Sequence, residues 1–182
     1  GFDNSAIKIL KTKKNLRLIN GSNYSSKELL KFLSFNQNIM LQSEDLNLFS
    51  NKNFKIVSKR KPTSKQLKDL IFAFNVCRYV KSNAIVLASN QTTVGIGSGQ
   101  PSRLDSCQIA ISKMKKFNLQ TDNLVAASDA FFPFVDGIEK LVQSGVKAII
   151  QPFGSIRDKE IIKFANETDT VLVFSKTRHF RH

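Results

Sequence analysis

The stretch LVAASDAFFPFVDG, residues 124–137, decides how this sequence is interpreted. Its apolar start, Leu124–Ala127, predicts a buried strand, and Asp136 opens a pattern that predicts a helix up to Ser144. Pro133 stiffens the turn between them, because its ring fixes φ and removes a backbone donor. Such a crossing from strand to helix is a common place for a ligand in α/β proteins. We therefore expect a binding site here, although the phenylalanines of the turn could instead only plug the end of the sheet.

The sequence on both sides of this stretch alternates helix and strand patterns from residue 62 onward. Predicted helices cover 63–81, 101–117, 136–144 and 155–165, and predicted strands cover 84–88, 94–98, 124–127, 146–150 and 171–174. Thr63 is a good N-cap for the first of these helices. Ser155 and Asp158 resemble a capping box at the start of the last one. The alternation predicts an α/β fold in which helices cover a sheet.

Residues 1–61 are less regular. The pattern of Lys27–Phe35 suits either a helix by propensity or a strand that pairs with Ile39–Gln42, and we favour the hairpin. The other elements expected here are a helix over 3–14, strands over 15–20 and 54–58, and a surface loop over 43–53. We therefore expect 1–61 to be an amino-terminal extension and 62–182 to be the main domain.

Composition limits the class of protein. The 182 residues are 41% hydrophobic, enough for one domain with an extension, and no run is long and apolar enough to span a membrane. No signal segment opens the sequence, so we expect a cytoplasmic protein. The net charge of +14 has three explanations, namely nucleic-acid binding, capture of small anions or biased composition, and we favour the last. Cys77 and Cys107 lack CxxC spacing and are expected to be buried free thiols.

Two glycine-containing stretches are candidate ligand sites. VGIGSGQPSR, residues 94–103, lacks the third glycine of a dinucleotide fingerprint. Its glycines either allow close approach of another backbone or place the strand against a ligand or partner chain. Arg103 falls in the first turn of the helix predicted over 101–117, where a positive charge is unfavourable because the helix dipole is also positive there. This small cost indicates that the guanidinium is needed to hold an anion. QPFGSIRD, residues 151–158, suits either an anion-binding loop or an ordinary N-cap.

Polar residues at 81–83 and 178–182 are further candidates. Asn83 is either a helix stop or an amide that points into a cleft. The chain end, RHFRH, contains both histidines, and chain ends usually fray. Arg178 suits a phosphate, whereas His179 and His182 lack the carboxylate or cysteine partners of a metal site. A histidine base must come from this tail or from another polypeptide segment.

Five stretches in order, KSNAIV, GIGSGQPSR, SDAFFPFVDG, QPFGSIRD and RHFRH, resemble the carboxy-terminal part of the bifunctional purine biosynthesis family. That family combines aminoimidazole carboxamide ribonucleotide transformylase with inosine monophosphate cyclohydrolase. The resemblance implies a three-layer α/β/α fold with a mixed sheet, in which 62–182 form the second of two cytidine-deaminase-like units. Residues 1–61 would join it from the first unit, which this chain lacks.

The resemblance also implies a reaction. A formyl group passes from 10-formyltetrahydrofolate to the 5-amino group of 5-aminoimidazole-4-carboxamide ribonucleotide, in a homodimer whose active sites cross the interface. The Lys-His catalytic pair of the family belongs to the first unit, so the isolated chain is expected to be inactive and to contain no catalytic residue. No membrane is implied as a partner, and nucleic acid is not expected.

Site residues follow from the same resemblance. The residues implied to bind the ribonucleotide are Asn83, Arg103, Phe131 and Arg178. Those implied to bind folate are Leu104, Pro133, Asp136, Ser155 and Ile156. Those implied to close the site are Phe180 and His182. Asp129 is a candidate ligand for a potassium ion. Phe153 stands where the family usually has a small residue and would either narrow the folate pocket or alter its mobility.

Two other functions compete with this one. The charge of +14 predicts a basic nucleic-acid-binding α/β domain, whose affinity would fall steeply with salt. The glycine-containing strand and the apolar helix after Thr63 instead suit a structural dimerisation module.

Overall fold

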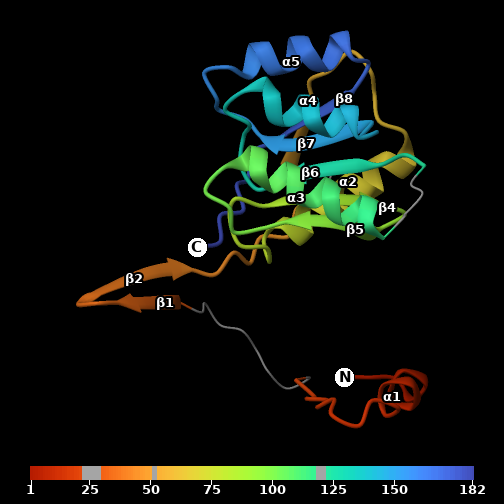
Figure 1. Cartoon of the computed structure of the whole chain (residues 1–182), viewed down its shortest axis with the longest axis vertical. Helices are drawn as coiled ribbons and strands as arrows, with labels where there is room; N and C mark the ends of the chain where they lie inside the picture. Colours follow the sequence, from red (N-terminus) through yellow and green to blue (C-terminus); the bar gives the residue numbers. More distant parts are fainter. Residues whose placement is uncertain (22–29, 51–52, 118–121) are drawn as a thin grey trace. The chain divides into compact units, whose positions relative to one another are not determined.

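The computed structural model describes residues 1–21, 30–50, 53–117 and 122–182. These residues form two compact units, Gly1–Glu44 and Asp45–His182 (Figure 1). The larger unit thus begins earlier than the boundary expected after Lys61. Residues 45–61 belong with it because Phe49 packs in its core and the strand Phe54–Ile56 joins its sheet.

The smaller unit contains one short helix and one hairpin. Helix α1 spans Asn4–Leu10 and is capped by Asp3, which accepts a hydrogen bond from the Ala6 amide at 2.7 Å. Strands β1 (Leu30–Phe35) and β2 (Asn38–Ser43) pair antiparallel. The preferred hairpin is therefore confirmed, although 27–29 lie outside the described residues. The expected strand over 15–20 is wrong, because these exposed residues belong to no strand in the described part of the chain.

The larger unit is built on a six-stranded mixed sheet with the order β3-β8-β7-β6-β4-β5. Its strands are β3 (Phe54–Ile56), β4 (Ile85–Ser89), β5 (Thr92–Gly97), β6 (Val125–Ser128), β7 (Ala148–Pro152) and β8 (Val171–Ser175). The central strands β6, β7 and β8 run parallel, and the remaining pairs are antiparallel. Strands β6 and β7 are buried along their whole length, which explains their continuous apolar pattern.

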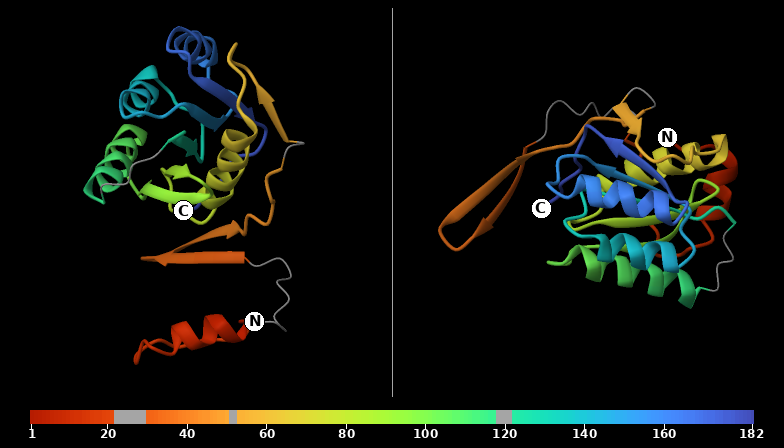
Figure 2. Two further views of the ribbon diagram at one scale, coloured as in Figure 1. Left: turned by 90° about the vertical axis from the view of Figure 1, so that its right-hand side faces the viewer. Right: turned by 90° about the horizontal axis from the view of Figure 1, so that it is seen from above.

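Helices cover both faces of this sheet, so the expected three-layer α/β/α fold with a mixed sheet is confirmed (Figure 2). Helix α2 (Ser64–Cys77) packs on one face, against Val86 and Ala127 among others. The other face is covered by α3 (Arg103–Lys116), α4 (Val135–Gln143) and α5 (Asp158–Glu167). None of the helices in the described part of the chain is long and apolar enough to cross a membrane.

The starts of α2 and α5 can be compared with the caps that the sequence predicts. Thr63 forms the predicted N-cap of α2, in a capping box with Gln66. This helix ends at Cys77 rather than near Lys81, because the chain must turn before β4. The capping box expected from Ser155 and Asp158 is wrong. A turn intervenes, so that α5 begins at Asp158 and the Ser155 hydroxyl accepts from the Arg157 amide instead.

The glycines of β5 allow α3 to approach closely. A Cβ atom on Gly97 would lie 1.8 Å from the carbonyl oxygen of Ser106, and one on Gly95 would lie 2.2 Å from that of Ala110. Both distances are far below van der Waals contact. Of the two interpretations of this strand, the structure therefore supports close backbone approach, and the approaching element is α3.

Candidate functional site

A cavity of about 430 Å³ lies where the first turn of α3, the loop after β6 and the chain end meet. Most residues implied by the resemblance line it, namely Asn83, Arg103, Leu104, Phe131, Pro133, Asp136, Arg178 and Phe180. They come from four separate stretches of the sequence. Ser155, Ile156 and His182 do not line this cavity.

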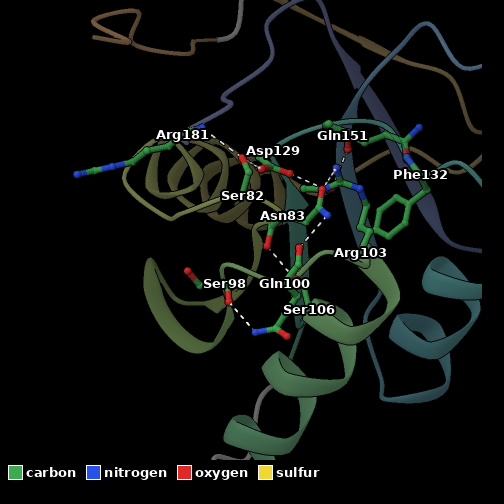
Figure 3. Close-up of polar contacts among 12 residues, drawn as sticks. Ser82, Asn83, Ser98, Gln100, Arg103, Ser106, Asp129, Phe132, Gln151 and Arg181 are labelled. Carbon is green, nitrogen blue, oxygen red and sulfur yellow. Dashed lines mark hydrogen bonds and ion pairs between the residues drawn. The ribbon is translucent and has the colours of Figure 1, made fainter. Parts of the chain in front are cut away.

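Arg103 is held in a buried hydrogen-bond network at the cavity wall (Figure 3). Its Nη1 donates to Ser128 Oγ at 2.9 Å and to the Asp129 carboxylate, and its Nη2 donates to Asn83 Oδ1 at 2.7 Å. The side chains of Arg103 and Asp129 are 9% and 0% exposed. The guanidinium is therefore fixed in place and already paired with an anion of the chain itself.

Asn83 is part of the same wall and does not stop a helix, since α2 ends six residues before it. Its Nδ2 donates to the carbonyl oxygens of Gln100 and Pro101 at 2.9 and 3.0 Å. Its own carbonyl accepts from Ser106 Oγ at 2.8 Å. Asn83 thus joins the loop before α3 to the Arg103 guanidinium. Of its two interpretations, the structure supports the amide at a cleft, since Asn83 lines the cavity.

Asp129 is held by hydrogen bonds within the chain, and the potassium ion expected near it stays a prediction. Its carboxylate accepts hydrogen bonds from Arg103 and, at 2.5 Å, from Ser82 Oγ. A cation bound to the same oxygens would face the guanidinium charge. Among the described residues no three or more histidine, cysteine or acidic side chains gather in a metal-binding cluster, which does not bear on an ion held by carbonyl oxygens.

The aromatic loop after β6 both fills the core and faces the cavity. Phe132 is buried against Gly137, and its amide donates to Gln151 Oε1 at 3.3 Å. All three phenylalanines contribute to the cavity lining, but Phe131 and Phe134 are the more exposed ones. The Arg178 guanidinium carbon lies 5.1 Å from the centre of the Phe131 ring. One phenylalanine therefore plugs the sheet, and two are available to a flat ligand.

The chain end is anchored, so the expected fraying does not apply to it. His179 is completely buried, its ring centre lies 4.4 Å from that of Phe74, and its Nδ1 contacts the Asp45 carboxylate. The His179 amide donates to the Asp129 carbonyl at 3.0 Å. This anchor lies between Arg178 and Phe180 in the sequence and holds both at the cavity. Sequence reasoning missed Asp45, because no local pattern connects it to a residue 134 positions away.

The remaining implied residues lie beside the cavity or away from it. Ser155 is half-buried, Ile156 is fully exposed, and His182 stacks on Phe180 with 5.7 Å between ring centres. Gly154 adjoins the cavity through Arg178, since a Cβ atom on Gly154 would lie 3.2 Å from Arg178 Nη2. Phe153 points to a different cavity and does not line this one.

The two cysteines are free and buried, as expected. Burial raises the pKa of Cys107 to about 12 and raises that of Cys77 well above its ordinary value. Both therefore remain neutral thiols near pH 7 and are poor nucleophiles. What the described cavity offers is binding: a fixed arginine, a more exposed arginine, aromatic faces and one carboxylate.

Comparisons with known proteins agree on one family. Residues 1–113 match the family model described as the AICARFT/IMPCHase bienzyme. The whole chain is 46% identical to the bifunctional purine biosynthesis protein PurH of Persephonella marina and 48% identical to that of Buchnera aphidicola subsp. Schizaphis graminum. It is 41% identical to that of Chlorobium phaeobacteroides. The chain spans about a third of the length of these relatives, since it covers 34–35% of each.

Proposed function

Because this chain belongs to the AICARFT/IMPCHase bienzyme family, we propose that it forms the carboxy-terminal half of a formyltransferase in purine biosynthesis. In the proposed reaction, 10-formyltetrahydrofolate gives its formyl group to the 5-amino group of 5-aminoimidazole-4-carboxamide ribonucleotide. The single observation that best supports this proposal is the convergence of the implied residues from four sequence stretches on one cavity.

The proposed role of this half is to hold and orient two substrates. The amine of the ribonucleotide is a weak nucleophile because it is conjugated with a carboxamide-bearing ring, so transfer depends on placing it against the formyl carbon. Phe131 offers an aromatic face for the imidazole ring. Arg178 is exposed and stacked on that face, so its guanidinium is free to form a charge-assisted pair with the phosphate.

The folate is proposed to occupy the side of the cavity formed by Leu104, Pro133 and Asp136. The aliphatic and proline side chains provide an apolar wall, and the Asp136 carboxylate accepts hydrogen bonds from the N–H groups of a pterin edge. Asp136 already accepts from the Gly137 amide at 2.7 Å, which fixes one of its oxygens. Ser155 and Ile156 adjoin this side only if their loop moves or a second chain completes the pocket.

The proton-transfer group is proposed to come from outside this chain. Neither histidine lines the cavity: His179 is buried against Phe74, and His182 stacks on Phe180. The titratable residues in the described lining are Arg103, Asp136 and Arg178, which are two cations and one carboxylate. The isolated chain is therefore expected to bind without turning over.

We further propose a homodimer, in which the β1–β2 hairpin packs on another chain. Phe32 and Leu41 are opposite each other in the hairpin and are 72% and 64% exposed, and Leu33 and Met40 on its other face are also exposed. A two-stranded hairpin is marginally stable by itself, and one with apolar side chains on both faces needs a partner surface.

The test is formyl transfer by the full-length protein, measured as tetrahydrofolate release that depends on the aminoimidazole ribonucleotide. Arg178→Met should lower kcat/KM by about 10–100-fold, since a hydrogen bond to a charged group contributes about 1.5–3 kcal/mol. Arg60→Met is the matched control, because Arg60 forms an exposed ion pair with Asp169 away from the cavity. Absence of the reaction in a folded full-length protein would refute the proposed function, and equal rates for both variants would refute the role of Arg178.

A further inference from the structure

Residues 178–182 are hydrogen-bonded to the rest of the larger unit on both sides of Phe180. The His179 amide donates to the Asp129 carbonyl at 3.0 Å. Two residues later, the Arg181 amide donates to Ser82 Oγ at 3.2 Å, and the Arg181 carbonyl accepts from the Ser82 amide at 2.9 Å. Phe180 lies between these two points, lines the cavity described above and is 38% exposed. The backbone that carries its ring is thus fixed before and after it.

Ser82 joins this segment to the buried ion pair (Figure 3). Its hydroxyl donates to the Asp129 carboxylate at 2.5 Å and accepts from the Arg181 amide. The same carboxylate accepts from Arg103, and the Asp129 side chain is 0% exposed. A serine hydroxyl has one hydrogen and two lone pairs, so it can donate and accept at the same time. An alanine at this position would make neither contact.

Ser82 itself does not line the cavity. It can therefore affect a ligand there only through residues that do. Two routes are available, one to Phe180 through the backbone of Arg181, and one to Arg103 through the Asp129 carboxylate. Both Phe180 and Arg103 line the cavity, so the two routes must be weighed against each other.

The route through Arg103 has other supports. Its guanidinium also donates to two further side chains, at 2.9 and 2.7 Å, and it keeps its ion pair when the Ser82 hydroxyl is removed. Residues 178–182, in contrast, belong to no helix or strand, so hydrogen bonds such as that from the Arg181 amide hold them in place. Loss of the hydroxyl should therefore loosen this segment more than it moves Arg103.

From these contacts we infer that Ser82 is a positioning residue, which holds Phe180 at the cavity through the backbone of Arg181. The inference rests on the proposed function in one respect only, namely that the ribonucleotide binds in this cavity. Without the hydroxyl, the Phe180 ring closes the cavity for a smaller fraction of the time. The Arg181 side chain keeps its hydrogen bond to the Tyr79 carbonyl at 3.0 Å, so the segment loosens rather than detaches.

The first measurement needs no ligand. Hydrogen exchange of the full-length protein, followed by mass spectrometry, should be about 3–10-fold faster for peptides covering 178–182 in Ser82→Ala than in the parent, the change expected for one lost hydrogen bond. Exchange in β6 and β7 should not change. Ser89→Ala is the matched control, because Ser89 is a buried serine whose hydroxyl donates to the Asp122 carbonyl at 2.9 Å and which does not line the cavity.

The second measurement is formyl transfer by the same proteins. Ser82→Ala should raise the KM for the ribonucleotide about 3–10-fold and leave kcat within about twofold, because Phe180 closes over the substrate while the proton-transfer group is proposed to lie elsewhere. Ser89→Ala should change neither constant. Phe180→Ala should raise KM by itself, and adding Ser82→Ala to it should have no further effect, since the ring to be positioned is gone.

Equal exchange of 178–182 in Ser82→Ala and Ser89→Ala overturns the inference, whether or not the protein transfers formyl groups. So does a full effect of Ser82→Ala in the Phe180→Ala background, which would assign the effect to the Arg103 route. Absence of the reaction in a folded parent counts against the proposed function instead, and the exchange measurement then decides the inference. Cooperative thermal unfolding shows that each variant is folded.

Discussion

Replacing Arg103 by methionine should lower the free energy of unfolding of the larger unit by about 3–5 kcal/mol, the usual cost of removing one partner from a buried ion pair. Asp129 is 0% exposed, so water cannot hydrate the carboxylate that remains. Ser128 Oγ and Asn83 Oδ1 also lose their guanidinium donor. Methionine keeps much of the apolar length of arginine, so the loss reports charge and hydrogen bonds rather than a large cavity.

Urea denaturation followed by far-ultraviolet circular dichroism measures this loss, and thermal unfolding gives a second reading. In a chain of this size, 1 kcal/mol shifts the midpoint by about 2–4 °C, so Arg103→Met should unfold roughly 6–20 °C lower. The matched control is Arg60→Met. Its ion pair with Asp169 has side chains that are 42% and 75% exposed, and it should change the free energy by less than about 1 kcal/mol.

A double variant tests the cause. Combining Arg103→Met with Asp129→Asn removes both charges, and the asparagine can still accept from Ser82 Oγ. This variant should be about 2 kcal/mol more stable than Arg103→Met alone, because no unpaired charge stays buried. A loss below about 1 kcal/mol for Arg103→Met, or a double variant less stable than the single one, would refute the reasoning.

Three further predictions concern the strand glycines, the chain end and the thiols. Gly97→Ala should destabilise the chain by about 3 kcal/mol or prevent folding, because its Cβ would lie 1.8 Å from the Ser106 carbonyl oxygen. Gly21→Ala should be neutral in the same denaturation assay, because its Cβ would meet no atom of the described residues within 4 Å. His179→Gln should release the chain end, seen as rapid carboxypeptidase digestion of a chain that otherwise stays folded; resistance equal to that of the parent would argue against the anchor. Burial raises the pKa of Cys107 from 9.0 to about 12, so the thiol loses its proton at a lower pH in the unfolded chain than in the folded one. The free energy of unfolding should therefore fall as pH rises above 9.0, by about 1.4 kcal/mol per pH unit. Denaturation of Cys107→Ala over the same pH range should lack this part of the slope.

Local patterns were sufficient for most of the larger unit. The continuous apolar run that starts at Leu124 predicted a buried strand, and β6 is one. Thr63 predicted the start of α2, because an N-cap depends on residues within one turn. The same kind of reasoning failed for residues 15–20, where alternation suggested a strand but none of the described strands pairs with them. A strand needs a neighbour for its backbone hydrogen bonds, and alternation alone does not supply one.

The site residues implied by the resemblance were also predicted only in part from the sequence. Sequence motifs were enough to identify the family, and most of the residues that the resemblance implied meet at one cavity. The motifs did not reveal that Arg103 is paired with Asp129, or that Phe132 is a buried core residue while Phe131 stays partly exposed at the cavity. Neighbours in a turn have nearly the same sequence context, and only their packing distinguishes them.

The sequence by itself determined the order of helices and strands in most of the larger unit, the buried strands and the family, because each depends on residue type, short-range spacing or motif order. The tertiary structure alone decided the sheet order β3-β8-β7-β6-β4-β5 and the burial of His179 against Asp45 and Phe74. It also separated Phe153 from the cavity beside Arg103, which the resemblance had placed it near. These features join residues far apart in the chain, and their energy comes from contacts and desolvation that exist only after the elements have packed.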